Sequence, residues 1–423
     1  MKKFLLARFL IFLMAVSACA SPLIAQQTKV EETENPLKAG IALTKPSQGR
    51  FVALEDGTFM VPYVANIPGT EITFEMMPIP GGTFSMGSED PKKPDQGPVF
   101  SVAIEPFWMG KHEITWEEFE EFMKLTPFFR KLNSEGVRVV TKETEIDAVT
   151  APSMLYDPQF TYDLGESPKH PAATITQFSA KQYTKWLSLS SQDFYRLPYE
   201  SEWEYACRGG TKTKWYFGDD ASKLKEHAWY LDNSDEERHL VGKLKPNPWG
   251  LHDMLGNVCE WTLDQYDQEG YSFIEKQRGS TQQPVLEQQV LPAHRAFNKP
   301  STEYPRCLRG GSWDLSDEEC TCFSRLGSDE EWKATEAGIP RSPWWFTDSL
   351  GMSAGFRIIR PLKTPSREEQ DSFWKADVKE IRSSVRQKVE FSGSGGTALV
   401  DEKLIEDLEK YIDPKVRKRR PNP

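Results

Sequence analysis

The chain has 423 residues, of which 38% are hydrophobic and 13 are tryptophan, enough to bury the core of one large domain or of two ordinary ones. Its formal net charge is -11. Because a protein needs a basic surface to displace the counterions around phosphate groups, this composition argues against broad nucleic-acid binding and favours an acidic globular protein.

The first twenty residues have the organisation of an export signal. Lys2, Lys3 and Arg8 precede an apolar run from Phe9 to Ala20, and small and polar residues follow it. That run is too short to cross the roughly 30 Å hydrocarbon core of a bilayer as a helix. We therefore predict a signal peptide over residues 1–20 and no permanent transmembrane segment there.

Two kinds of cleavage fit the end of this signal. The quartet Val16–Cys19 resembles the lipobox of bacterial lipoproteins, in which the cysteine is lipidated, so Cys19 is a candidate lipidation site. The small residues around Cys19 also fit ordinary cleavage before Ser21. Both alternatives predict an exported protein that is periplasmic, anchored to a membrane by a lipid, or secreted, and disulfides persist in those compartments.

Residues 21–50 form a predicted linker, and residues 51–74 a predicted β-rich extension. The linker is polar and contains proline, a composition typical of flexible tethers. In the extension, Asp56-Gly57 separates two apolar-rich runs and predicts a hairpin. We expect a second pair of strands around Gly81-Gly82.

Three segments have helical patterns. In the first, Thr115 and Glu118 have the spacing of a capping box, and the apolar residues that follow fall on one face. The second, residues 178–189, has the apolar periodicity of an amphipathic helix. The third follows Tyr199 and is expected to stop at Gly209.

The remaining segments are predicted from their composition. Residues 264–305 are polar and lie between two strongly patterned blocks, which favours a surface insertion. Residues 363–423 contain a charged helical pattern over 366–389, a Ser-Gly linker over 392–396, a second short helix near Leu404 and the basic end KVRKRR. We therefore predict a C-terminal helical extension with a basic tail.

Sequence blocks spread over residues 75–362 occur together in one known family. They are IPGGTFSMGS, FWMGKHEITWEEFEEFM, HPAATITQFSAKQYTKWL, YRLPYESEWEYACRGG, KPNPWGLHDMLGNVCEWT, RGGSW and AGFRIIR. This order resembles that of the sulfatase-modifying-factor family, typified by the formylglycine-generating enzyme. The resemblance implies an α+β domain of C-type-lectin-like fold with little regular secondary structure. Members include copper-dependent oxidases that convert a sulfatase cysteine to formylglycine, and relatives that do other chemistry or only bind.

The resemblance also implies a pair of copper-binding cysteines, of which this chain has one. In the formylglycine-generating enzyme, cysteines three and eight residues after the serine of the GGS block hold Cu(I), a soft cation that suits thiolates. Counted from Ser312, the eighth position is Cys320, but the third is Leu315. Leucine cannot bind a metal, and a single thiolate is a poor Cu(I) site. Cys320 and Ser312 are therefore the candidate catalytic residues of an incomplete site.

Two other cysteines could complete a thiol site. Cys322 shares a face with Cys320 if this segment is extended, and such a C-x-C pair could bind copper or form a strained disulfide. Cys259 stands where the family usually has tryptophan, near the active-site cysteines, so Cys259 and Cys320 could recreate a pair. Buried thiols or structural disulfides are the alternative for all three residues.

Cys207 and Cys307 are two further thiols. The resemblance implies that Cys207 pairs with a cysteine directly after the GFR block, but that position is Ile358 here. Cys207 is then either free or paired elsewhere, with Cys307 and Cys322 as candidates. Without Cys19 the number of cysteines is odd, so at least one thiol of a monomer stays unpaired.

The resemblance further implies a calcium site in the block GLHDMLGNVCEW. Its ligands would be the side-chain oxygens of Asp253 and Glu260 and the backbone carbonyls of Gly256 and Val258. Hard oxygen ligands from a tight loop suit Ca²⁺. The alternative is that Glu260 caps a loop without a metal.

Two functions remain open from the sequence. The incomplete cysteine pair favours a binding or accessory module for a protein, such as a sulfatase, or for a glycan. The alternative is a copper-dependent oxidase that makes formylglycine with a rearranged thiol site. Trp313, Trp332, Trp344 and Trp345 bear on the first function, because they form either core or an exposed aromatic platform for a sugar or peptide.

Overall fold

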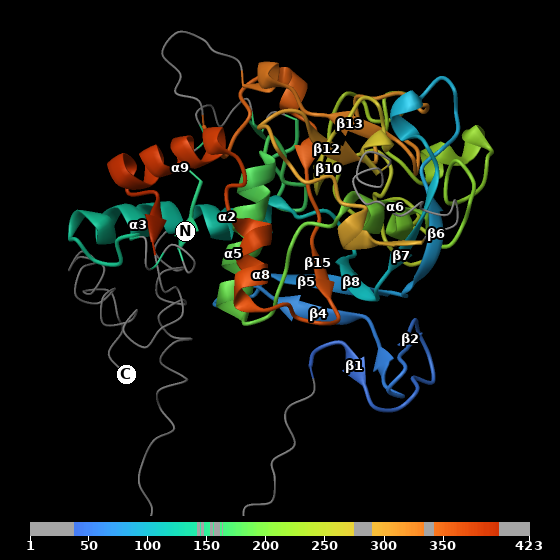
Figure 1. Ribbon diagram of the computed structural model, residues 1–423, viewed down its shortest axis with the longest axis horizontal. Coiled ribbons are helices and arrows are strands. Elements are labelled where there is room, and N and C mark those ends of the chain that lie inside the picture. Colours follow the sequence, from blue (N-terminus) through green and yellow to red (C-terminus); the bar gives the residue numbers. More distant parts are fainter. Residues whose placement is uncertain are drawn as a thin grey trace, which may run out of the picture.

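Figure 1 shows the computed structural model of the chain. It describes residues 38–141, 144, 148–152, 155, 161–162, 164–274, 290–333 and 342–396. The predicted export signal, Cys19, the second C-terminal helix and the basic tail lie outside these residues. Within them, none of the helices combines the length and the apolar character needed to cross a bilayer.

Short helices and short strands alternate along the chain, which confirms the predicted α+β class. One four-stranded sheet has the order β15-β8-β5-β4, and a second has the order β13-β12-β10-β14. The remaining strands form the sheets β11-β7-β6 and β1-β3-β2 and the pair β16-β9. The strand bounds are β1 Ile41–Ala42, β2 Val52–Ala53, β3 Phe59–Met60, β4 Tyr63–Asn66, β5 Thr73–Ile79, β6 Gly82–Met86, β7 Phe100–Ile104, β8 Phe107–Gly110, β9 Val149–Thr150, β10 Cys259–Gln265, β11 Leu291–Pro292, β12 Arg306–Arg309, β13 Arg325–Gly327, β14 Ala354–Gly355, β15 Ile359–Pro361 and β16 Gly395–Gly396.

The two predicted strand pairs have different outcomes. β2 and β3 pair antiparallel across the Asp56-Gly57 turn, so the first prediction is confirmed. The second is wrong, because β5 pairs with β4 and β8 whereas β6 pairs with β7. The oxygen of Tyr205 would lie 2.5 Å from a Cβ at Gly82. The helix that carries Tyr205 therefore packs against the start of β6.

The three predicted helices are all present. α2 (Trp116–Met123) begins with the Thr115/Glu118 capping box and is followed directly by α3 (Leu125–Ser134). α5 (Gln177–Ser191) covers the second pattern. α6 (Glu200–Arg208) ends at Gly209, whose φ of 58° is left-handed, a conformation that glycine adopts at little cost.

α5 is buried on nearly every side rather than on one face. Even Lys181 and Lys185 are buried, 4% and 3% exposed. The cause is α8 (Arg367–Trp374), which packs along α5 (Figure 1). Lys181 pairs with Asp377 just beyond α8, at 3.0 Å. The C-terminal extension therefore covers the side of α5 that would otherwise face solvent.

The C-terminal extension differs from the prediction in two ways. The expected single helix is two, α8 and α9 (Lys379–Ser392), because Lys375 is extended and ends α8. The Ser-Gly segment is not a linker, since Gly395 and Gly396 form β16, pair with β9 and are buried. These glycines let β16 lie against Phe129, where a side chain would collide.

The predicted surface insertion is partly built into the body. Leu291 and Pro292 form β11 and pair with β7, and Tyr271 is buried against Phe100 at 5.2 Å between ring centroids. Residues 275–289 of this insertion lie outside the described residues. The described parts of 264–305 thus belong to the core as well as to the surface.

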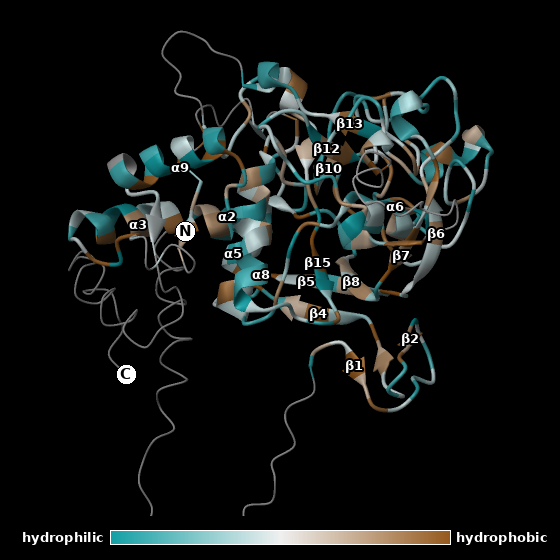
Figure 2. Cartoon of the chain, in the orientation of Figure 1, coloured by the Kyte–Doolittle hydropathy of each residue, from teal (hydrophilic) through white to brown (hydrophobic). Residues whose placement is uncertain are grey.

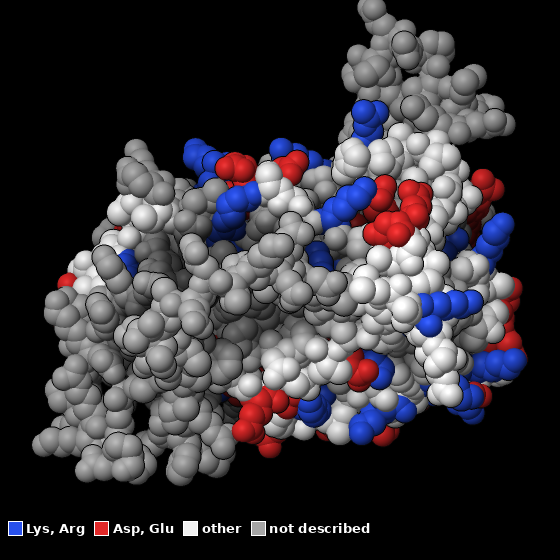
Figure 3. All heavy atoms as spheres, turned by 90° about the horizontal axis from the view of Figure 1, so that it is seen from below, with Lys and Arg blue, Asp and Glu red and all other residues white. Residues whose placement is uncertain are grey.

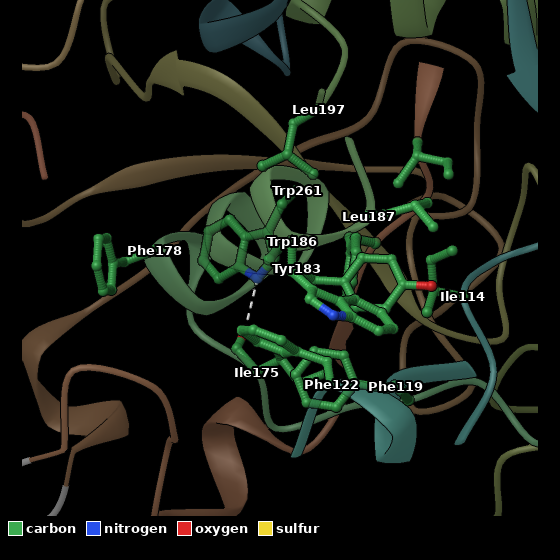
Figure 4. Close-up of a cluster of buried hydrophobic side chains, with 14 of the residues drawn as sticks. Ile114, Phe119, Phe122, Ile175, Phe178, Tyr183, Trp186, Leu187, Leu197 and Trp261 are labelled. Atoms are coloured by element: carbon green, nitrogen blue, oxygen red, sulfur yellow. Dashed lines mark hydrogen bonds between the residues drawn. The ribbon is translucent and has the colours of Figure 1, made fainter. Parts of the chain in front are cut away.

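The core around α5 is a cluster of packed rings (Figure 4). Phe119 stacks on Tyr183 at 5.7 Å, and Phe122 lies 5.7 Å from Trp186. The Trp261 indole donates a 2.6 Å hydrogen bond to the Ile175 carbonyl. Figure 2 shows the contrast with the outside, where α9 is largely hydrophilic while β7 and β15 are hydrophobic.

Candidate functional site

The candidate site lies where β12 runs into the turn Gly310-Gly311. Gly311 has a φ of 75°, and a Cβ there would lie 2.6 Å from the Cys320 sulfur. The turn therefore requires glycine both for its left-handed backbone and for the close approach of Cys320. It brings Ser312, Leu315 and Cys320 into one region of the loop.

The Cys320 thiol is fully buried and protonated. It donates a hydrogen bond to the Ser312 carbonyl at 3.6 Å. Burial raises the pKa of this thiol to about 12, because a thiolate loses its solvation there. Since the thiolate is the form that binds metals and attacks disulfides, Cys320 is unreactive in this arrangement.

Asp314 joins the candidate residues into a small polar cluster that the sequence analysis missed. The Ser312 hydroxyl donates to one Asp314 oxygen at 2.6 Å, and the Ser353 hydroxyl to the other at 3.5 Å. The spacing of Ser312 and Asp314, a serine followed two residues later by an aspartate, was the available signal. Ser312 is thus held by a carboxylate and faces no histidine base in this cluster.

Cys259 lies on the far side of the same cluster. Its thiol donates to the Ser353 carbonyl at 3.2 Å. Burial, followed by the nearby Asp314 carboxylate, raises its pKa well above the usual range. Cys259 and Cys320 each bond to a separate backbone carbonyl, so the structure brings them into one cluster as two neutral thiols.

Leu315 lines a cavity of about 220 Å³ at the surface of this loop. It shares the lining with the apolar side chains of Leu308 and Leu326 and with the polar side chains of Asp95 and Glu319. A second cavity, of about 320 Å³, lies on the other side of the turn from Lys93 to Gly97. Leu315 therefore lines a surface cavity, whereas Cys320 is fully buried and is not part of that lining.

Cys207 and Cys322 are in contact in the interior. Their sulfur atoms are 3.4 Å apart, and both side chains are fully buried. Cys307 instead bonds to the Leu308 carbonyl at 3.7 Å. Of the two partners considered for Cys207, the structure places Cys322 beside it. Cys322 consequently faces Cys207 and not Cys320.

Two residues of the predicted calcium site, Asp253 and Glu260, lie beside an arginine. Arg357 donates to both oxygens of Glu260, at 2.5 and 2.6 Å, and Trp203 donates to one of them at 2.7 Å. Asp253 accepts from the Gly242 amide at 2.6 Å, while its second oxygen is buried without a partner. The charge that a calcium ion would supply is already provided by the guanidinium.

A third carboxylate stands beside this arginine. Glu113 accepts from the Asn257 side chain at 2.8 Å and from the Val258 amide at 3.1 Å. Burial raises the pKa of Glu113 well above its usual range and that of Asp253 to about 6. Calcium needs six to eight oxygen ligands. Calcium at Asp253, Gly256, Val258 and Glu260 therefore stays a prediction from the resemblance.

A network of buried ion pairs supports the site from below. Arg309 is fully buried, forms an ion pair with Glu204 and donates to the Phe323 and Ser324 carbonyls at 2.6 and 2.5 Å. Arg325 donates to both oxygens of Glu200, at 2.5 and 3.1 Å. Charged residues are rarely buried, and nothing in their spacing indicates that these would be.

Two further expectations concern metals and aromatic residues. Among the described residues, no three His, Cys, Asp or Glu side chains are grouped so as to hold a metal ion. Trp332, Trp344 and Trp345 are buried in the ring cluster around α5, and only Trp313 of the four is partly exposed. An exposed platform of four tryptophans is therefore wrong.

Charged side chains are mixed on the face shown in Figure 3. Lysine and arginine lie among aspartate and glutamate around its rim. The part of this face formed by described residues shows no continuous basic area of the kind that follows a nucleic-acid backbone.

Comparison with known proteins assigns the chain to one family. A family model described as sulfatase-modifying factor enzyme 1-like domain matches residues 67–341. The serine/threonine-protein kinase pkn1 of Chlamydia pneumoniae is 30% identical over 256 residues, which are 60% of this chain and 35% of the kinase. The chain thus spans about a third of that relative. The formylglycine-generating enzyme of Bos taurus is 27% identical over 261 residues, 54% of this chain and 67% of the enzyme.

Other relatives differ in their described activity. The inactive C-alpha-formylglycine-generating enzyme 2 of Bos taurus is 28% identical over 248 residues, 50% of this chain and 80% of that protein. Among solved structures, variable protein 1 of Treponema denticola matches with a TM-score of 0.47 and 20% identity over 71% of this chain and 99% of its own. PvdO from Pseudomonas aeruginosa matches with a TM-score of 0.46 and 24% identity over 70% and 100%.

Proposed function

Since this chain belongs to the family of sulfatase-modifying factor enzyme 1-like domains, we propose that it is an exported member that binds a partner without oxidising it. The family contains relatives described as active formylglycine-generating enzymes and one described as inactive. Membership alone therefore leaves the activity open, and the argument depends on the site.

One observation carries the proposal. Leu315 stands where the resemblance implies one copper-binding cysteine, and Cys320 is buried, with its pKa raised, and donates to a backbone carbonyl. A soft cation such as Cu(I) would need two thiolates here. Binding requires neither thiol, because the cavity at Leu315 is open to ligands while the buried Cys320 thiol is not.

The proposed partner is a protein, since relatives carry names for enzymes that act on proteins. We propose that the described domain presents the Leu315 cavity to this partner outside the cytoplasm. A sulfatase is one candidate, and the accessory role would then consist of holding it rather than modifying it.

The test measures copper binding and peptide oxidation together. The mature protein is titrated with Cu(I) against a chelator of known affinity, and a cysteine-containing sulfatase peptide is followed by mass spectrometry under oxygen. The expected result is no competitive copper binding and no aldehyde product. Oxidation of the peptide by the wild-type protein would overturn the proposal.

Two variants sharpen this measurement. Leu315→Cys supplies a second thiol at a partly exposed position and is expected to gain Cu(I) binding, because two thiolate ligands offset the cost of ionising the buried Cys320 thiol. A gain shows that the assay detects a complete pair. Cys320→Ser is expected to leave the wild-type result unchanged.

One observation favours a second candidate function, that of an oxidase. Cys259 and Cys320 share the polar cluster around Asp314, so an oxidase with a rearranged thiol pair would use these two residues. This candidate predicts copper binding by the wild-type protein that is lost in both Cys259→Ser and Cys320→Ser. Loss in only one variant would exclude a shared site.

A further inference from the structure

Two cavities flank one turn on the site's outer surface. The turn runs from Lys93 to Gly97 and includes η1 (Pro94–Gln96). The outer cavity lies on one side of it and reaches Glu89, Asp90 and Glu269. The inner cavity lies on the other side and reaches Leu315, and Lys93 lines both. We call these two cavities, which share Lys93 in their lining, the Lys93 groove.

The wall between the two cavities is held in place by hydrogen bonds from elsewhere in the fold. The Tyr271 amide donates to the Gly97 carbonyl at 2.7 Å, and the Ser88 amide to the Gln96 carbonyl at 2.7 Å. The Arg325 guanidinium donates to the Asp95 carbonyl at 2.5 Å. The groove is therefore largely preformed, which lowers the cost of binding a ligand in it.

Acidic side chains exceed basic ones along this groove. Arg325 lines the inner cavity, but Glu200 neutralises it, so Lys93 is the one lining cation whose charge is not balanced by an ion pair in the described chain. The lining carboxylates are Glu89, Asp90, Asp95, Glu269 and Glu319. The groove consequently has a negative potential that favours cationic ligands.

The inner cavity combines this charge with an apolar floor. Leu315 and Leu326, both partly exposed, supply the apolar part, whereas Leu308 is fully buried, and the Asp95 and Glu319 carboxylates come from separate segments. One Asp95 oxygen accepts from the Tyr266 hydroxyl at 3.2 Å, and one Glu319 oxygen from the Ser316 hydroxyl at 2.8 Å. Each carboxylate keeps a second oxygen that can accept a further bond.

We propose that the Lys93 groove binds a peptide that presents a lysine side chain to the inner cavity, with its methylene stem on Leu315 and its ammonium group between Asp95 and Glu319. A lysine side chain combines an apolar stem with a compact charge that donates three hydrogen bonds. This inference rests on the proposed binding function and names its ligand chemistry. Leu315 then has a role of its own, as the surface that packs against the stem.

The experiment compares two fluorescent peptides that differ at one group. Both have the sequence Ala-Ala-Lys-Ala-Ala, and one carries N-acetyl-lysine, which keeps the stem and removes the charge. Fluorescence anisotropy with the purified full chain is expected to show binding of the lysine peptide at least tenfold tighter, weakened as salt is added. Equal binding of both peptides, or binding by neither, would overturn the inference.

Some variants are expected to weaken binding of the lysine peptide and another to strengthen it. This contrast separates the loss of a charge in the groove from damage to the fold. Glu319→Gln and Asp95→Asn are expected to weaken binding of the lysine peptide several-fold, because each removes a charge from the inner cavity. Lys93→Gln removes the competing cation and is expected to strengthen binding. Weakening by all three variants would indicate a structural effect and overturn the inference.

The control is Asp220→Asn, which removes an exposed carboxylate outside the groove lining, and it is expected to bind like the wild type. If the lysine peptide does not bind, the peptide inference is overturned, but the proposal that the protein does not oxidise its partner still stands. Oxidation of a sulfatase peptide would overturn the proposed function whatever the peptides do, so the two failures are distinguishable.

Discussion

Around α5 the interior consists of packed rings, whereas around β12 it consists of arginines paired with carboxylates and carbonyls. Phe119, Phe122, Tyr183 and Trp186 lie within 6 Å of ring neighbours in the first region. In the second, Arg309 is fully buried with Glu204 and Glu200. Both regions are equally inaccessible to solvent, but they are held by different interactions.

The difference follows from the amount of regular structure in each region. Helices satisfy their own backbone groups, so α2 and α5 need only apolar packing between them. Irregular loops leave carbonyls unpaired, and buried carbonyls require donors. An arginine has five N–H donors, and Arg309 and Arg325 use them to bond loop carbonyls as well as carboxylates. The side chains of these arginines thus supply hydrogen bonds to loop carbonyls that a helix or a sheet would satisfy with backbone amides.

The largest expected effect comes from removing one of these arginines. Arg309→Ala leaves the Glu204 and Glu200 carboxylates buried without their partner and frees the Phe323 and Ser324 carbonyls. Loss of one member of a buried pair costs about 3–5 kcal/mol, which denaturant unfolding would measure. Arg386→Ala breaks an exposed pair with Glu390 and is the matched control, expected to change nothing measurable. An Arg309 variant as stable as the wild type would show that the network is not what holds the loops.

The next effect concerns the contact between Cys207 and Cys322. When the unfolded protein is refolded with oxidised glutathione, which can then reach both thiols, the two are expected to form a disulfide and release two reduced glutathiones, because the fold brings their sulfurs to 3.4 Å. The bond would tie α6 to the loop after Cys320 and stabilise the protein by about 2–4 kcal/mol. Intact mass after alkylation and unfolding in denaturant would measure both results. Cys322→Ser should show neither, and free thiols at both positions after oxidation would refute the expectation.

A smaller effect on stability, one that depends on pH, is expected from the buried carboxyl group of Asp253, one oxygen of which has no partner. Burial raises the pKa of Asp253 to about 6, above the value of about 3.9 in an unfolded chain. The folded state therefore binds this proton more tightly, and its contribution to stability is present below about pH 4 and lost as the pH rises to about 6.

Asp253→Asn should remove this pH dependence and stabilise the protein at pH 7 by on the order of 2 kcal/mol. Thermal unfolding at several pH values would measure the change. Asp56→Asn at an exposed turn is the control. An unchanged pH profile in the Asp253 variant would contradict the assignment.

The smallest effect is expected in the ring cluster. Ile175→Val removes one methylene from a fully buried position beside Trp261. Apolar cores lose about 0.5–1.5 kcal/mol on this substitution, and denaturant unfolding would detect it. A loss as large as that of Arg309→Ala would remove the distinction between the two regions.

Several elements could be predicted because their signals are local. The capping box of Thr115 and Glu118, the left-handed Gly209 and the Asp56-Gly57 turn each act through neighbours in the chain. The placement of β5 and β6 in different sheets was not predicted, because the Gly81-Gly82 turn between them has the local pattern of a hairpin. The buried strand β16 was also missed, because its glycines have the composition of a linker.

The site divides in the same way. The missing cysteine at Leu315 is visible in the sequence, because it depends only on counting from Ser312. The state of Cys320 depends on burial, and the contact of Cys207 with Cys322 depends on two segments that only the fold brings together. Asp314 became part of the site through its bonds to Ser312 and Ser353, which come from different loops.

The sequence by itself determined the family, the α+β class, the positions of three helices and the presence of Leu315 where the resemblance implies a cysteine, because each depends on residue identity at short range. The tertiary structure decided which charges are buried, which thiols meet and where a ligand can enter. Those outcomes depend on desolvation and on contacts between distant segments, and no spacing along the chain encodes them.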